Sequence, residues 1–325
     1  MKKCFDAEKY LKLQKAKIFE RVKMFDKLYL EFGGKLIDDK HAARVLPGFL
    51  PDLKIRLLEE FREQAEVILC ISAIALEAEK TRADNEMGYG DELIRLMEFL
   101  RGRGLLVRSV VITLFDGQKK AVEFGEKLKK YDVFVHFHKF TKGYPEDVAK
   151  IVSEEGYGAN SFIETTKPLV IVSAPGASSG KMATCLSQVY HENKRGVRAG
   201  YAKFETFPVW NLGLDHPVNL AYEAATADIE DFNMIDPFHL EKYGVEAVNY
   251  NRDVATFPLL QEIFRRTLGE EIYFSPTDMG VNMVGECIFD DEAVREAARA
   301  EVFRRFDGAE SEKEQAAIRE IIGRL

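Results

Sequence analysis

The sequence predicts an α/β fold in which helices cover both faces of a parallel sheet, giving three layers. Apolar runs alternate with amphipathic stretches from residue 53 to residue 205. The apolar runs are nearly continuous, which is typical of strands buried on both faces of a parallel sheet. Right-handed crossovers would bring the carboxyl ends of these strands to one edge, where ligands bind in such folds.

The individual elements follow from hydrophobic periodicity and from the positions of glycine and proline. An amphipathic helix is predicted at 6–25. Residues 28–32 and 35–37, joined by Gly33-Gly34, are predicted to form a hairpin, with a plain exit from a strand as the alternative. We then predict helices at 54–64, 91–102, 117–130, 145–155 and 182–192, and strands at 67–72, 107–114, 133–138, 169–173 and 200–205.

The pattern loosens after Glu205. Residues 206–244 are rich in Pro, Asn, Asp and aromatic side chains, with short helical pieces at 220–227 and 239–243. Such segments often form the walls of a site. A strand at 245–250, a helix at 256–268 and two long helices after Asp290 complete the chain. We predict an α/β domain at 1–272 and a helical extension at 273–325.

The composition argues against several classes of function. The 325 residues are 46% hydrophobic and 31% charged, with a net charge of −8. This acidic balance argues against a general nucleic-acid binder. No run of 18 apolar residues and no signal peptide are found, so we expect a cytoplasmic protein without a membrane contact. The four scattered cysteines indicate reduced thiols. The oligomeric state, a homo-oligomer included, stays open.

The stretch at 168–190, PLVIVSAPGASSGKMATCLSQVY, carries the most chemical information. It combines a buried strand, a loop of small residues and a helix that opens at Gly180-Lys181. In the phosphate-binding loop GxxxxGK[ST], backbone amides and a lysine hold phosphate and a hydroxyl holds Mg²⁺. Here Pro175 replaces the first glycine, Gly176 comes one place late, and Met182 stands at the hydroxyl position. The hydroxyl could come from Ser178, Ser179 or Thr184.

Phosphoryl transfer also needs carboxylates and a proton acceptor near the phosphates. Asp116 and Glu205 each follow an apolar run, which would place both at the ligand edge of the sheet, although Asp116 could instead cap a helix. His216 follows Asp215 in the irregular segment and could transfer a proton. We therefore predict Lys181, Asp116, Glu205 and His216 as catalytic residues. The predicted ligands of Mg²⁺ are Thr184, Asp116 and Glu205.

Three other patterns are weaker. His191-Glu192 begins HENKR and lacks the second histidine of a zinc protease. His136 and His138 share one strand face and could chelate a metal, but a half-buried histidine pair is favoured. Cys185 lies one helical turn after Lys181. A buried thiol is favoured there over a nucleophile with a low pKa.

Many further segments resemble one bacterial family. They are EKYLKLQ (8–14), KLYLEFGGKLIDD (27–39), ARVLPGF (43–49), SVVIT (109–113), EEGYG (154–158), IETT-KPLVIV-SAPG (163–176), GKMATCLSQVYHE (180–192), GYAKFETFPVWNL (200–212), HPVNLAYEAATADI (216–229), NMIDPFHLE (233–241), VNYNRDV (248–254) and SPTDMGVNMVG (275–285). They are similar to the family catalogued as domain of unknown function 1846, from residue 5 to about residue 306. The resemblance implies a cytosolic α/β protein with a P-loop-like, nucleotide-binding-type N-terminal domain, and it supplies no reaction.

Members of that family read APGPGSGKM at the loop, where this chain has Ala177 and Ser178 instead of Pro and Gly. Members also continue into further C-terminal domains. This chain is then either a natural short form or a truncated product, and we expect residues 273–325 to be the start of a truncated C-terminal region.

The sequence predicts a P-loop-like protein that binds a nucleotide, ATP or GTP with Mg²⁺, or another phosphate-bearing small molecule. Gly176, Ser178, Ser179, Gly180, Lys181 and Thr184 are the predicted binding residues. Nucleotide-dependent kinase or ligase chemistry on a small molecule is the leading hypothesis. The alternatives are a regulatory module that binds an anion without chemistry, and a domain in which the loop only packs.

Overall fold

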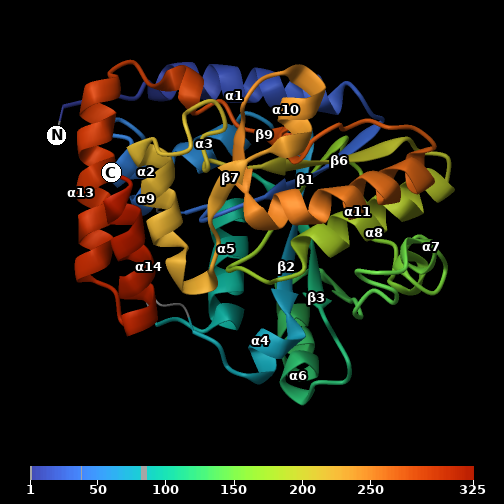
Figure 1. The fold of residues 1–325 in the computed structure, drawn as a ribbon. Helices are drawn as coiled ribbons and strands as arrows, with labels where there is room; N and C mark the ends of the chain where they lie inside the picture. The colour runs from blue at the N-terminus through green and yellow to red at the C-terminus, as the bar shows by residue number, and fades with distance from the viewer. Residues whose placement is uncertain (1, 38, 82–85) are drawn as a thin grey trace.

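The central sheet confirms the predicted α/β fold. The structure is a computed structural model and describes residues 2–37, 39–81 and 86–325. Within these ranges, seven parallel strands pair in the order β4-β3-β2-β5-β1-β6-β9 (Figure 1). They are β1 (Lys27–Phe32), β2 (Ala65–Ser72), β3 (Leu106–Thr113), β4 (Phe134–Phe137), β5 (Leu169–Ser173), β6 (Ala199–Phe204) and β9 (Gly280–Val281). The bounds of β5 are those that the sequence predicts.

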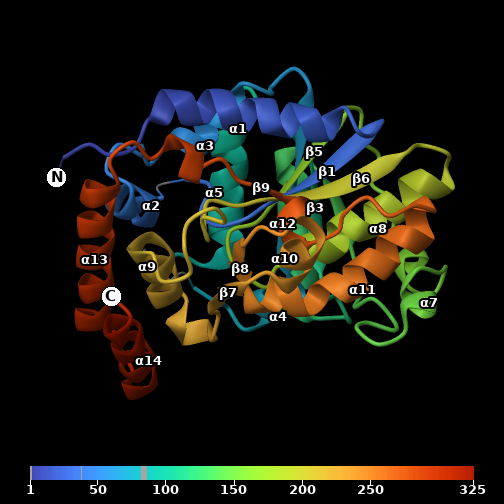
Figure 2. The same cartoon turned by 45° about the horizontal axis from the view of Figure 1, so that its top comes forward.

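Helices cover both faces of the sheet. They are α1 (Ala7–Val22), α2 (Lys40–Val45), α3 (Leu53–Glu59), α4 (Ala73–Glu77), α5 (Tyr89–Gly102), α6 (Lys119–Leu128), α7 (Val148–Ile151), α8 (Lys181–Lys194), α9 (Pro217–Ala225), α10 (Pro237–Tyr243), α11 (Asn251–Leu268), α12 (Pro276–Met279), α13 (Asp291–Asp307) and α14 (Glu312–Gly323). Side chains of α1, α3, α5 and α6 share one buried cluster with Leu30 and Ile171. Those of α7, α8 and α11 share another with Tyr29 and Val170. Figure 2 shows α1 on one side of the strands and α8 with α11 on the other.

The predicted hairpin at 28–37 is wrong. β1 lies inside the sheet and pairs in parallel with β5 on one edge and with β6 on the other. Because both rows of backbone groups are already paired, β1 has no free edge for a returning strand. The Gly33 N–H still donates to Phe204 C=O at 3.0 Å, so the chain leaves the sheet only after Gly33. The alternative, a plain exit from a strand, is the one observed.

Two other predicted elements differ. The helix predicted at 145–155 is confined to α7 (Val148–Ile151), because the Ser153 hydroxyl accepts the N–H groups of Glu155 and Gly156 and turns the chain. The strand predicted at 245–250 is β8 (Val248–Tyr250). It pairs antiparallel with β7 (Asn233–Ile235) and stays outside the central sheet.

The last fifty residues pack closely onto the rest of the chain. α13 lies against α9 and α2, and its buried residues share a third cluster with α9 and the start of the chain. β9 adds a short parallel strand beside β6. The segment predicted as a helical extension therefore also contributes to the sheet. None of the helices in the described ranges is long and apolar enough to cross a membrane.

The side chain of Gln14 connects α1 to β9, and its removal should destabilise the fold. This fully buried amide donates to Val281 C=O at 2.8 Å and accepts from Met283 N–H at 2.8 Å. In Gln14→Leu both backbone groups lose their partner, so we expect the free energy of unfolding to fall by about 2 to 4 kcal/mol. Urea denaturation measures this. Gln261→Leu, at a half-exposed position of α11, is the control and should change it by less than about 0.5 kcal/mol. Equal effects of the two substitutions would contradict this role of Gln14.

Candidate functional site

A large cavity lies where two neighbouring strands leave the sheet toward opposite faces. After β1 the chain passes through α2 to α3 on one face, and after β5 it continues into α8 on the other. Such a topological switch point separates the loops at the carboxyl ends of the strands and leaves a crevice between them. The cavity has a volume of about 960 Å³ and is lined by Gly33-Gly34 after β1 and by residues 174–180 after β5. This volume is in the range of ligand sites.

The loop after β5 is held in a conformation that requires glycine. Gly180 has φ +75°, and a Cβ atom there would lie 2.8 Å from the Thr113 side chain. Thr113 Oγ1 donates to Ser179 C=O at 2.8 Å and fixes the loop against β3. A Cβ atom on Gly176 would lie 2.6 Å from the ring of Tyr89. The glycines therefore let the loop backbone approach its neighbours closely.

The start of α8 faces this loop with open backbone donors. The first turn of the helix closes with the hydrogen bond from Thr184 N–H to Gly180 C=O. The N–H groups of residues 181–183 come before this bond and therefore have no acceptor within the helix. Gly180 is the N-cap and has no side chain to accept from them. The hydroxyl of Ser179 is buried and has no hydrogen-bond partner among the described residues. These donors, with the helix dipole, favour an anion at this end of the cavity.

Lys181 supplies a positive charge beside the open amides. Its side chain lines the cavity and is 14% exposed, and its Nζ lies 3.9 Å from Glu31 Oε1. Glu31 is buried at the end of β1 and accepts a hydrogen bond of 2.8 Å from the Tyr201 hydroxyl. The lysine is thus directed into the cavity by a carboxylate that is itself fixed.

A second charged group lies across the cavity at the end of β6. Lys203 Nζ is 2.8 Å from Glu205 Oε1 and also pairs with Asp253 at the start of α11. Burial would lower the pKa of Lys203, but Asp253, Glu205 and Glu31 outweigh it and hold the pKa above its ordinary value. Burial, with Asp253 and Glu31 nearby, raises the pKa of Glu205 to about 7 against the pull of Lys203. A carboxyl group with this pKa is suited to proton transfer near neutral pH.

The predicted binding residues meet at this cavity. Gly176, Ser178, Ser179, Gly180, Lys181 and Glu205 all line it. Thr184 also borders it, but its hydroxyl is buried against the sheet and accepts from Cys70 Sγ at 3.5 Å. The sequence reading did not identify Glu31, Lys203 or Asp253. Lys203 and Glu205 are two residues apart at the end of a strand and therefore share one side of it, and Glu31 interrupts an apolar strand. Both signals are visible in the sequence.

Two predicted residues lie elsewhere. Asp116 is exposed beyond the end of β3 and does not line the cavity; its N–H donates to the Gln118 side chain at 2.7 Å. His216 caps α9. Its Nδ1 accepts from Val218 N–H at 3.2 Å, and its Nε2 lies 3.0 Å from Asp291 Oδ1. Neither residue faces Lys181.

Of the predicted Mg²⁺ ligands, Thr184 and Glu205 line the cavity and Asp116 does not. In the ranges that the structure describes, no group of three or more His, Cys, Asp or Glu side chains is arranged to hold a metal ion. The His136 and His138 rings both hydrogen-bond to Ser161, at 3.3 and 3.1 Å. Burial lowers the pKa of His138 to about 4.

Cys185 is a buried thiol, as the favoured interpretation predicts. It is fully enclosed between α8 and the sheet. Burial raises the pKa of its thiol well above the ordinary value, in spite of nearby Lys181. The alternative of a nucleophile with a low pKa is therefore wrong.

Comparison with known proteins identifies the family. The family described as "Domain of unknown function DUF1846, N-terminal" matches residues 3–323. The chain belongs to this family. The DUF1846 domain is 55% identical over 306 residues to a UPF0371 protein of Streptococcus thermophilus, covering 94% of this chain and 62% of the relative. A UPF0371 protein of Clostridium botulinum is 56% identical over 307 residues, with 94% and 61% covered.

A third relative, the UPF0371 protein DIP2346 of Corynebacterium diphtheriae, is 55% identical over 304 residues, which cover 93% of this chain and 61% of the relative. The chain thus spans about three fifths of the length of the curated relatives that it matches. The family resemblance read from the sequence segments is confirmed over nearly the whole chain.

The raised pKa of Glu205 predicts a pH-dependent stability of this DUF1846 domain. The folded state binds the proton with a pKa of about 7, against 4.5 for an ordinary glutamate. The stabilisation is therefore complete below about pH 4.5 and is lost as the pH rises toward 7. Glu205→Gln removes this titration, so the wild-type protein should lose roughly 1 to 3 kcal/mol relative to the variant between about pH 5 and pH 8.

Urea denaturation at both pH values measures this difference. Glu241→Gln, which changes an exposed glutamate of α10, is the control. A pH-independent difference between the wild type and Glu205→Gln would show that Glu205 titrates normally.

Proposed function

We propose that this domain binds a phosphate-bearing small molecule, a nucleotide such as ATP or GTP, with its phosphates at the loop 174–180. The observation that carries the proposal is the meeting of four features at one switch-point cavity. They are a tight glycine loop, the uncapped start of α8, the buried hydroxyl of Ser179 and the cavity-facing Lys181. Backbone amides and a lysine are what phosphate oxygens require.

The rest of the cavity supports a ligand larger than phosphate alone. Its wall includes Tyr89, Tyr222 and Tyr250, beside polar groups at the end of β6 and the start of α11. Aromatic faces with a few fixed polar groups are typical of sites for nucleotides and similar molecules. A P-loop-like arrangement is therefore part of the proposal, with Met182 at the position of the usual hydroxyl.

The charged group at the end of β6 favours an enzyme, of the nucleotide-dependent kinase or ligase class. The acceptor's nucleophile would form a bond to the terminal phosphorus. The bond from that phosphorus to the bridging oxygen would break, and its electron pair would leave with the nucleotide diphosphate. Glu205 would take the proton of the nucleophile, a role suited to a carboxylate with a pKa of about 7. Lys181 and Lys203 would offset negative charge.

A second candidate function is a module that binds the nucleotide without chemistry. Met182 lacks the hydroxyl that normally positions Mg²⁺, and the Thr184 hydroxyl faces Cys70 instead of the loop. The lack of a hydroxyl for Mg²⁺ at these two positions should reduce hydrolysis more than it reduces nucleotide binding. The third reading, a loop that only packs, is disfavoured because Lys181 lines the cavity.

Replacement of Lys181 should weaken nucleotide binding. We expect Lys181→Ala to raise the dissociation constant of ATP or GTP about tenfold or more, because a charge-assisted contact to phosphate is lost. Isothermal titration calorimetry, with and without Mg²⁺, measures it. Lys194→Ala, at the exposed far end of the same helix, is the matched control and should bind like the wild type. Absence of binding in the wild type, or equal binding by all three proteins, would refute the phosphate site.

The enzyme and the binding module predict different outcomes for Glu205→Gln. If Glu205 accepts a proton, the variant should consume ATP about 10² to 10⁴ times more slowly than the wild type. Its affinity for ATP should stay within about threefold, because the loop is untouched. Release of ADP from the wild type and the variant, followed by chromatography, tests this. Nucleotide binding by a wild type that never releases ADP would instead support the binding module.

A further inference from the structure

A smaller cavity adjoins the first one and has a different character. Its volume is about 670 Å³, and it extends from the loop after β1 to α2 and α13. Glu205, Tyr222 and Arg305 line both cavities, so the two spaces meet at the end of β6. Its wall has seven lysines and arginines against two carboxylates, and these cations include Lys54, Arg44, Arg304 and Arg305.

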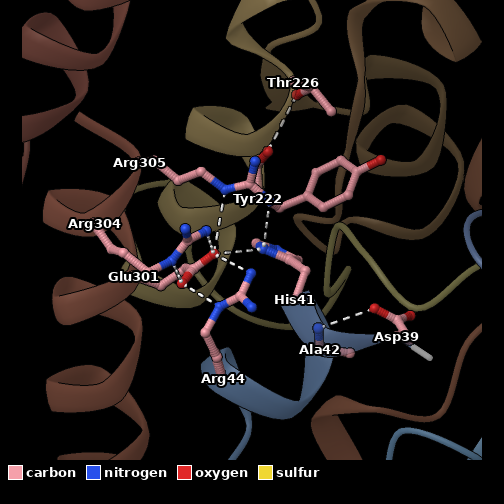
Figure 3. Close-up of polar contacts among 9 residues, drawn as sticks. All are labelled: Asp39, His41, Ala42, Arg44, Tyr222, Thr226, Glu301, Arg304 and Arg305. Atoms are coloured by element: carbon pink, nitrogen blue, oxygen red, sulfur yellow. Dashed lines mark hydrogen bonds and ion pairs between the residues drawn. The ribbon is translucent and has the colours of Figure 1, made fainter. Parts of the chain in front are cut away.

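Three of these cations surround one buried carboxylate (Figure 3). Glu301 on α13 binds Arg44 of α2 through two contacts of 2.7 and 3.0 Å. It also binds Arg304 through contacts of 2.6 and 2.7 Å, and Arg305 at 3.2 Å. His41 Nδ1 lies 3.1 Å from the same carboxylate. The cluster joins segments 257 residues apart, so the fold itself assembles it.

The charges of this cluster do not balance. Hydrogen bonds from Arg304, His41 and Arg44 outweigh burial and hold the pKa of Glu301 well below its usual range, so the carboxylate is ionised. Burial outweighs the contact with Glu301 and lowers the pKa of His41. Three guanidinium groups thus face one carboxylate, an excess of two positive charges. Burial, with Arg304 and Arg44 nearby, also lowers the pKa of Arg305. An anion in the cavity would relieve this repulsion.

The guanidinium groups keep donors for such an anion. Each carries five N–H groups, of which Glu301 engages at most two. The side chains of Arg44, Arg304 and Arg305 are 34%, 48% and 30% exposed, so they remain open to the cavity. Lys54, by contrast, is buried and pairs with Asp39 at 2.8 Å. The surplus charge therefore lies on the arginine side.

We propose that the arginine-lined cavity binds the anionic group, a carboxylate or a phosphate, of a second small molecule whose remaining part points to Glu205. Planar guanidinium groups bind such oxyanions through paired hydrogen bonds. The inference rests on the proposed function in one respect, because it assigns this molecule as the co-substrate of the ligand at the loop. The second substrate is then a small acid, bound next to Glu205, the proposed proton acceptor that lines both cavities.

The test isolates this cavity from the loop. Malonate and inorganic phosphate are titrated by calorimetry into the full chain carrying Lys181→Ala, which weakens the loop site. Arg304→Gln is added to that background, and it leaves Arg44 and Arg305 on Glu301. Arg299→Gln, an exposed arginine of the same helix that lines neither cavity, is the matched control. We expect Arg304→Gln to weaken binding of at least one probe about tenfold and Arg299→Gln to leave it unchanged.

Arg304→Lys keeps the charge but loses the paired geometry, and it should bind with intermediate affinity if the site is real. Thermal unfolding verifies that each variant is folded. Absence of malonate and phosphate binding in the Lys181→Ala background, or equal affinity in the Arg304→Gln and Arg299→Gln proteins, would overturn the inference. The proposed function is tested separately. It fails if Lys181→Ala binds ATP as tightly as the wild type.

Discussion

The parallel pairing of β1 with β5 is the constraint on which the rest of the structure depends. The two strands exchange backbone hydrogen bonds along Leu28–Glu31 and Leu169–Val172, yet their connections pass to opposite faces of the sheet. Their loops must therefore separate, and the cavity lies between them. The same pairing places Glu31 beside Lys181 and Gly33-Gly34 opposite the loop 174–180. The site is a consequence of topology before it is a consequence of any single side chain.

The charges around the cavity are costly to bury and indicate function. Glu31, Lys203 and Glu205 lie at strand ends that could have been covered by apolar side chains. Ion pairs in such places seldom add net stability, because the loss of hydration offsets their attraction. The raised pKa values of Lys203 and Glu205 in a cleft are instead typical of sites that bind or transform a ligand. The arginine group around Glu301 extends this pattern to a second cavity that meets the first at Glu205.

The sequence predicted the central sheet well because strands buried on both faces carry a strong signal, as at Leu169–Ser173. It also predicted the loop and Lys181, because their residues are adjacent in the chain. It failed for the hairpin after β1, since nothing local shows that both edges of that strand are taken. It placed Asp116 at the site from a strand end alone, and could not see that Arg44 and Glu301 meet across 257 residues. Long-range contacts are set by packing, which local patterns do not record.

A crystal structure of the domain grown with ATP would test the central claim most directly. The account predicts phosphate density at the start of α8, with phosphate oxygens about 2.7 to 3.2 Å from the backbone N–H groups of residues 181–183 and with Lys181 Nζ in contact. Phosphate density elsewhere on the surface, with an empty loop and Lys181 still directed at Glu31, would contradict it.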